Sequence, residues 1–207
     1  MKFTARMDGR YSGLDKFSLN LKFFTEYFCG KCFVQVFQRR FDGSVDFQVG
    51  WDAYVNGFGN KSGEFWLGLR KIHQLTEVEG CRLRVDLKDF EGNQAYAEYR
   101  SFSVANEDDL FRIRVSGYSG SADDDLRHHD YHVFSTFDRD NDPYSGANCA
   151  TLKGRGQGGW WFHGSCYHCA LNAAWGRSEG SYHNIVWQDW KGPRHALQAT
   201  TMKLRCD

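Results

Sequence analysis

Residues 81–104 read CRLRVDLKDFEGNQAYAEYRSFSV, and this stretch decides the fold class. From Cys81 to Leu87, apolar residues alternate with charged ones, which is typical of a strand with one buried face. Glu91-Gly92-Asn93 supplies a turn, and residues 94–104 are predicted to return as a second strand. The stretch therefore predicts an antiparallel hairpin in the middle of the chain.

Shorter patterns extend this layout on both sides. The same alternation predicts three more strands, near residues 32–40, 111–115 and 197–205. Apolar residues from Phe47 to Phe58 recur at helical spacing, so a short helix is expected around residues 49–57, and a second around residues 66–75.

Residues 117–192 lose regular periodicity and are rich in Gly, Asp, Asn, His and Trp. A long irregular stretch inside a compact domain is usually functional, or is held together by metal and disulfides. The expected fold class is α+β, with a central antiparallel sheet, short helices and a large irregular lobe over residues 117–192.

Composition narrows the choice of function. A chain of 207 residues suffices for one domain. Its 26 basic and 26 acidic residues cancel, and this balance argues against a nucleic-acid partner, because phosphate binding needs a basic excess or a basic face. No membrane span is expected, because no run approaches 18 apolar residues.

Seven cysteines, from Cys29 to Cys206, favour an oxidising compartment with disulfide bonds. Reduced, buried thiols in a cytosolic protein are the alternative. The odd number leaves one thiol unpaired or bonded to another chain, and Cys81 and Cys206 pair if their strands are neighbours. An extracellular location is expected, although MKFTARMDGRYSGLDK at the start carries charges throughout and shows no signal segment.

The clearest chemistry lies in residues 138–146, DRDNDPYSG. Three aspartates alternate in a turn-prone loop, and carboxylates so placed can converge on one hard cation such as Ca²⁺. The loop is not an EF-hand, since Pro143 and Cys149 occupy the positions that require Gly and a bidentate Glu. A solvated acidic turn without metal is the alternative.

A second motif, HxxCxHC, contains His163, Cys166, His168 and Cys169. These residue types bind zinc, but ligands this crowded in sequence do not readily reach one tetrahedral ion. A zinc site is therefore not expected.

Several different short motifs follow one another in a fixed order along most of the sequence. Residues 36–44 read VFQRRFDGS, residues 56–59 read NGFG and residues 63–68 read GEFWLG. Later matches are LRVDL at 83–87, GYSG at 117–120, FST at 134–136, NCA at 148–150, WW at 160–161 and WKG at 190–192. From about residue 34 to residue 205 the chain resembles the fibrinogen-like domain, including lectin-like members such as the ficolins and tachylectins.

The resemblance implies a calcium site in the acidic loop. Two Asp side chains, Asp140 and Asp142, and two backbone carbonyls, of Tyr144 and Gly146, would hold the ion, with Asp138 as a supporting group. Ala147 resembles an insertion in this loop. The expected cofactor is Ca²⁺.

The resemblance also implies a disulfide between Cys149 and Cys166, with a ligand pocket beside it. A cis peptide bond between Ser165 and Cys166 and aromatic walls would hold an acetyl group. The implied ligand-binding residues are Cys166, Tyr167, Tyr182, His183 and His195. Lectin-like members carry several tyrosines where this chain has Pro193, Arg194 and His195. The resemblance therefore implies the pocket but not its specificity for acetylated sugars.

Residues 1–32 depart from the family's N-terminal subdomain, so the expected division is an atypical segment at 1–32 and a fibrinogen-like domain at 33–207. Cys29, Cys32 and Cys169 are then candidates for the odd thiol. No Gly-rich phosphate loop or nucleophile motif is present, so no enzyme is expected.

The implied function is calcium-dependent, lectin-like recognition of acetylated or other glycans on microbial or host surfaces, of the innate-immunity type. The alternative is a protein-binding module for a protein receptor, with a vestigial sugar pocket. A homo-oligomer is possible in either case.

Overall fold

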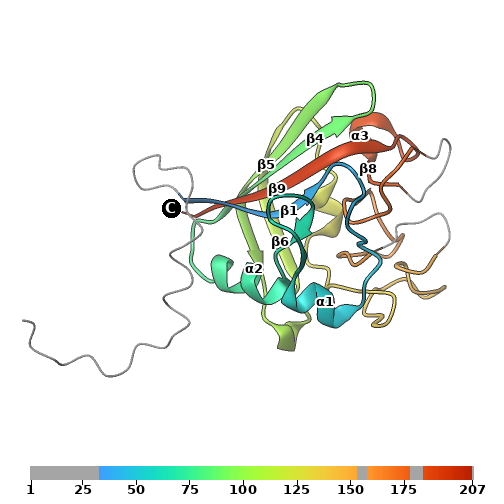
Figure 1. Ribbon diagram of the computed structural model, residues 1–207. Helices are drawn as coiled ribbons and strands as arrows, with labels where there is room; N and C mark the ends of the chain where they lie inside the picture. The colour runs from blue at the N-terminus through green and yellow to red at the C-terminus, as the bar shows by residue number, and fades with distance from the viewer. Residues whose placement is uncertain (1–32, 153–157, 178–183, 207) are drawn as a thin grey trace, which may run out of the picture.

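The structure is a computed structural model that describes residues 33–152, 158–177 and 184–206. Its centre is a seven-stranded antiparallel sheet with the strand order β2-β3-β1-β9-β4-β5-β6 (Figure 1). The strands are β1 (Phe33–Arg40), β2 (Phe58–Gly59), β3 (Phe65–Trp66), β4 (Arg82–Asp89), β5 (Gln94–Val104), β6 (Ile113–Gly120) and β9 (Leu197–Cys206). The α+β class and the central antiparallel sheet are confirmed.

The predicted hairpin forms the heart of this sheet. β4 and β5 pair in register from Leu83 opposite Tyr99 to Lys88 opposite Gln94. Leu83, Val85 and Leu87 are buried, so the alternation in the sequence is the alternation of buried and outer positions along β4. The last strand, β9, lies between β1 and β4 and so completes the middle of the sheet.

The position of β9 beside β4 also brings two cysteines together. Arg82 is in register with Arg205, and the next residues, Cys81 and Cys206, form a disulfide. The pairing expected for neighbouring strands is confirmed. Cys169, one of the three candidates for the odd thiol, is buried and unpaired.

Both predicted helices are present, and they are short. α1 (Trp51–Asn56) and α2 (Leu69–Thr76) lie near residues 49–57 and 66–75 as expected. α2 packs against β5 through buried Leu69 and Ile72. Two 3₁₀ turns (Glu107–Asp109 and Leu126–His129) and the four-residue α3 (Gln188–Lys191) complete the helical structure of the described residues.

The irregular lobe begins after β6, which carries the sheet to Gly120, three residues past the predicted start of the lobe. Within the lobe the regular strands are β7 (Cys169–Ala170) and β8 (Val186–Trp187), which pair with each other. Buried aromatic side chains replace secondary structure as its framework, and Phe134, Trp160 and Trp161 are each at most 1% exposed. This lobe carries the acidic loop and Cys166.

The motifs GEFWLG and VFQRRFDGS meet at one buried carboxylate. Glu64 is fully buried, and its Oε1 accepts the N–H groups of Phe41, Asp42 and Gly43 at 2.6–3.0 Å. Its Oε2 accepts the Val45 N–H. Arg40 Nε lies 3.7 Å from Glu64 Oε1. The residues that carried the family resemblance therefore build the turn after β1.

No helix among the described segments is long and apolar enough to cross a membrane.

Candidate functional site

The acidic loop starts with an aspartate that has a structural role. The Trp51 N–H donates to Asp138 Oδ1 at 2.9 Å, and the Thr136 hydroxyl donates to the same oxygen at 2.6 Å. Partial burial opposes ionisation, but these hydrogen bonds hold the pKa of Asp138 below its usual value. Asp138 therefore joins the acidic loop to the N-terminus of α1.

Asp140 and Asp142 form the acidic pair of the loop. The Asp142 N–H donates to Asp140 Oδ1 at 3.2 Å, so the two residues are held next to each other. Partial burial and the negative charge of Asp140 raise the pKa of Asp142. The two carboxylates thus repel each other when both are ionised.

Asp142 also connects the loop to the disulfide. Its Oδ1 accepts the Tyr144 N–H at 2.9 Å, and its Oδ2 accepts the Cys149 N–H at 2.8 Å. One side chain therefore fixes the next turn of the acidic loop and the backbone of the first disulfide cysteine. Protonation of Asp142, or a metal ion bound to it, would therefore change the hydrogen bond that holds the Cys149 backbone.

Gly146 lies against the ring of Tyr144. A Cβ atom added at Gly146 would come within 2.8 Å of the Tyr144 ring, so only glycine permits this approach with the ring in place. The loop from Asp140 to Gly146 is consequently compact, as a site that combines side-chain and backbone oxygens requires.

These residues fit a calcium ion chemically. Asp140 and Asp142 offer carboxylate oxygens, which are the ligands that Ca²⁺ prefers. Burial and, to a smaller extent, the charge of Asp140 raise the pKa of Asp142, and a bound divalent cation would relieve the repulsion between the two carboxylates. Tyr144 and Gly146 would supply backbone oxygens, as the resemblance implied.

The disulfide between Cys149 and Cys166 is confirmed, with Cα atoms 5.4 Å apart and both side chains fully buried. The expected cis peptide bond before Cys166 is wrong, because the described residues contain none. Instead, Cys166 adopts a positive φ of 72°. His163 and Cys166 exchange two backbone hydrogen bonds, of 2.8 and 2.9 Å, and this turn fixes the trans peptide in the sharp reversal.

Tyr167 follows the disulfide and points into the protein. Its side chain is 5% exposed, and its carbonyl accepts a hydrogen bond from the Gln188 amide at 3.0 Å. It contributes to the packing of the lobe on α3 and offers little surface to a ligand in this conformation. Cys166 and Tyr167 are adjacent as expected, whereas Tyr182 and His183 lie outside the described residues.

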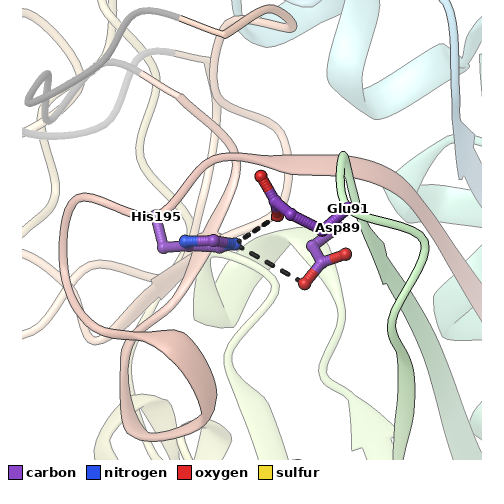
Figure 2. Close-up of side chains that lie close together, drawn as sticks. All are labelled: Asp89, Glu91 and His195. Atoms are coloured by element: carbon purple, nitrogen blue, oxygen red, sulfur yellow. Dashed lines mark ion pairs between the residues drawn. The ribbon is translucent and has the colours of Figure 1, made fainter.

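His195 lies at the β4–β5 hairpin. Its Nε2 is 3.1 Å from Glu91 Oε2 and 3.6 Å from Asp89 Oδ2 (Figure 2). Asp89 is fully buried, and Lys191 Nζ contacts the same Asp89 oxygen at 3.0 Å. The contacts of His195 therefore connect the loop before β9 to the hairpin.

Asp89, Glu91 and His195 have the residue types of a metal site, and their ligand atoms lie within 4.8 Å of one another. Two cations already neutralise the two carboxylates, because Lys191 pairs with Asp89 and Arg177 with Glu91. Burial opposes ionisation of Asp89, but hydrogen bonds from Asn93 and Lys191 lower its pKa to about 2. A divalent ion would have to displace Lys191, so we interpret the cluster as an ion-pair network.

A recess of about 390 Å³ lies beside the first disulfide cysteine. It is lined by Gln48, Phe137, Ala150 and Thr151. Phe137 is 44% exposed, so this recess presents an apolar ring next to polar groups at the edge of the acidic loop. Sequence analysis did not single out these residues, since nothing in their spacing brings residue 48 next to residues 137 and 151.

A histidine cluster was also missed. The Ser165 N–H donates to His163 Nδ1 at 3.0 Å, so Nδ1 carries no proton and Nε2–H donates to His168 Nδ1 at 2.9 Å. His129 Nε2 accepts the N–H groups of His168 and Cys169, both at 3.2 Å. Neutral imidazoles thus hold the segment that contains Cys166 and Tyr167.

The pKa values in this cluster follow from burial. Burial, followed by the charges of His168 and other neighbouring histidines, lowers the pKa of His163 to about 4. Burial also lowers the pKa of His168 and brings that of His129 well below its usual value. His163 and His168 bind each other and Cys166 is in a disulfide, so the HxxCxHC motif builds this cluster.

Comparison with known proteins identifies the relatives of this fold. The family model for the C-terminal globular domain of fibrinogen beta and gamma chains matches residues 12–207. The sequence is 47% identical to human Microfibril-associated glycoprotein 4 over 178 residues, which are 82% of this chain and 68% of that protein.

Two solved structures extend the similarity. The fibrinogen-like globe domain of human ANGPTL6 superposes with a TM-score of 0.79 at 41% identity, covering 84% of this chain and 78% of that chain. A lamprey fibrin D-dimer, complexed with the peptide ligand Gly-His-Arg-Pro-amide, has a TM-score of 0.77 at 35% identity. The match covers 84% of this chain and 61% of that chain.

Proposed function

The chain belongs to the fibrinogen C-terminal globular domain family, and from this premise we propose that it is a secreted, calcium-binding recognition module without catalytic activity. Asp140, Asp142, Tyr144 and Gly146 would hold the ion. The relative named as a glycoprotein supports an extracellular place, as do the two disulfides.

The observation that carries the proposal is the contact between Asp142 and Cys149. A carboxylate expected to bind calcium accepts the N–H of a disulfide cysteine at 2.8 Å. The disulfide in turn holds Cys166 and the turn that begins at His163. Calcium binding would therefore order the segment on which the expected ligand pocket depends, although no ligand atom need touch the ion.

For the ligand we propose an acetylated or otherwise polar glycan. The recess with Phe137 beside the disulfide offers an apolar wall and polar neighbours, which an acetyl group and sugar hydroxyls require. Tyr182 and His183 remain expected pocket residues. His195 would act on the pocket only indirectly, through the loop it connects to the hairpin.

A second candidate is a protein or peptide ligand. The lamprey relative was solved with a bound peptide, which shows that a domain of this fold can present a peptide site. Tyr167 is buried here and leaves less aromatic surface for a sugar, which favours this alternative.

A glycan array separates these candidates. We expect the purified protein to bind acetylated glycans with calcium present and to lose most of the signal with excess chelator. The matched variants are Phe137→Ala, which removes the apolar wall, and Val78→Ala, which removes another exposed apolar side chain. Phe137→Ala should weaken glycan binding and Val78→Ala should not. Absence of binding to every acetylated glycan in calcium would favour the protein-ligand function.

A further inference from the structure

The outer face of the sheet carries a basic groove at the end of β9 nearest the C-terminus. Figure 1 shows this end of β9 beside the start of β1. The groove has a volume of about 270 Å³. Its basic lining residues are Arg82, Arg84, Arg100, Lys203 and Arg205, and Glu98 is the acidic residue among the described lining. Five positive charges and one negative charge leave four positive charges here, in a protein whose net charge is zero. The sheet therefore concentrates basic residues on one face.

The alternation of the strands places these side chains together. Leu83 on β4 and Leu204 on β9 face the core, so the residues that flank them in sequence face outward. The register sets Arg82 opposite Arg205 and Arg84 opposite Lys203. Like charges directly opposite each other in an antiparallel pair destabilise a sheet, so this arrangement has a cost that an anionic ligand would remove.

Acidic neighbours compensate the second of these pairs. Arg84 contacts Asp86 and Glu98, each at 2.7 Å, and Lys203 contacts Asp86. The pair Arg82 and Arg205 lies one step further along the strands, and on β1 the residue in register with Arg205 is Val34. Arg82 and Arg205 thus add two exposed guanidinium groups at the rim of the groove.

Arg100 adds a third guanidinium to that rim. The register of Leu83 with Tyr99 sets Arg100 beside Arg82 at the next position. The Arg100 side chain runs over Gly117 of β6, where an added Cβ would lie 2.9 Å from Arg100 Cβ. Arg82, Arg100 and Arg205 are all exposed and lie on three adjacent strands, β4, β5 and β9, which spans about 10 Å.

We propose that this arginine row binds a linear sulfated polysaccharide. Guanidinium groups pair with oxyanions in bidentate geometry, and three of them in a row suit a ligand with several anionic groups along an extended chain. The one aromatic side chain that lines the groove, Tyr99, is 1% exposed, so the described lining offers no platform on which nucleic-acid bases stack.

This site shares no residue with the acidic loop or with the Cys149–Cys166 disulfide. Sulfated-polysaccharide binding is therefore expected to persist in excess chelator, whether or not the calcium proposal is correct. The two proposals fail independently.

The test uses a heparin-derived decasaccharide in isothermal titration calorimetry, at 50 and 150 mM NaCl, with chelator present. The variant Arg82→Gln/Arg100→Gln/Arg205→Gln is expected to bind at least about ten-fold more weakly than the wild type at the lower salt. Its dependence of log K on log salt is expected to be less steep by about one per arginine removed. The control Lys61→Gln/Lys71→Gln/Arg194→Gln loses the same charge elsewhere on the exposed surface and should bind within about two-fold of the wild type.

Equal affinity of the two triple variants would overturn the proposal, as would failure of the wild type to bind. Tighter binding of duplex DNA, or of vesicles that contain phosphoinositides, through the same arginines would overturn the assignment to a sulfated polysaccharide. The thermal midpoint of the triple variant is measured beside its affinity, to show that the variant folds. If it does not fold, the single exposed change Arg100→Glu is tested in its place, with the same loss of affinity expected.

Discussion

At the scale of single residues, Glu64 shows how a buried charge can specify a turn. It accepts four backbone N–H groups from residues 41, 42, 43 and 45 and lies beside Arg40. A carboxylate so surrounded is stable because its oxygen lone pairs are used and its charge is compensated. The turn after β1 and the strand β3 are therefore fixed to each other by one side chain.

Glu64→Gln should destabilise the domain by about 2–4 kcal/mol, because an amide NH₂ would face backbone donors and Arg40 would lose its counter-charge. Urea unfolding followed by tryptophan fluorescence measures the change. The control Glu107→Gln breaks an exposed pair with Arg70 at 2.9 Å and should cost less than about 1 kcal/mol. Similar losses for both variants would contradict the structural role of Glu64.

At the scale of elements, the sequence predicted the strands and helices whose apolar residues recur at a regular spacing. Alternation along β4 and β5 is visible because one face of the sheet is buried and the other is charged. The pairing of Cys81 with Cys206 was predicted only for the case that their strands are neighbours, and the structure supplies that condition by placing β9 beside β4. Regular elements can be found this way because each residue's environment repeats along the strand.

The segment from His163 to Cys169 had no such period. Its conformation depends on contacts with residues distant in sequence, such as the hydrogen bonds from the backbone of His168 and Cys169 to His129. The comparison with the family implied a cis bond before Cys166, but the turn closed by His163 accommodates a trans bond here. His195 was expected at the pocket because of its place in a motif, and its contacts with Asp89 and Glu91, which that motif does not reveal, connect it to the hairpin.

The histidine cluster predicts that the lobe loosens in acid. His163 has a pKa of about 4 in the folded protein and about 6.5 when unfolded, so the unfolded protein binds more protons between these values. Its contribution to stability is complete above about pH 6.5 and is lost as the pH falls towards 4. We expect thermal unfolding to show a drop on the order of 2 kcal/mol from this residue across that range.

The variant His163→Gln tests the source of this drop. Glutamine does not titrate, so the variant should be less stable than the wild type near pH 7 but should lose less stability on acidification. Calorimetry at pH 7, 6, 5 and 4 gives both slopes. A wild-type stability that is constant over this range, or equal slopes for the two proteins, would contradict the assignment to His163.

At the scale of the whole molecule, the two proposed sites lie in different parts of the fold. The basic groove lies at the end of β9 in the sheet, and the acidic loop and the disulfide lie in the lobe. Figure 1 shows the lobe, in yellow and orange, on the opposite side of the picture from the C-terminal end of β9. The hydrogen bonds of Gln38 to Leu171 and Asn172 fix the lobe to β1. Such a division would allow the lobe to respond to calcium, as proposed, while the sheet remains unchanged.

The most direct measurement for the calcium-ordered lobe is hydrogen exchange read by mass spectrometry, in calcium and in excess chelator. We predict that chelator raises exchange in residues 138–152 and 163–169, since Asp142 connects the acidic loop to Cys149 and the disulfide continues to Cys166. Exchange in β4 and β5 should not change. Asp140→Ala should show the chelated pattern even in calcium, whereas Asp138→Ala should still respond to calcium. Identical exchange of the wild type in calcium and in chelator, across both segments, would contradict a calcium-ordered recognition lobe.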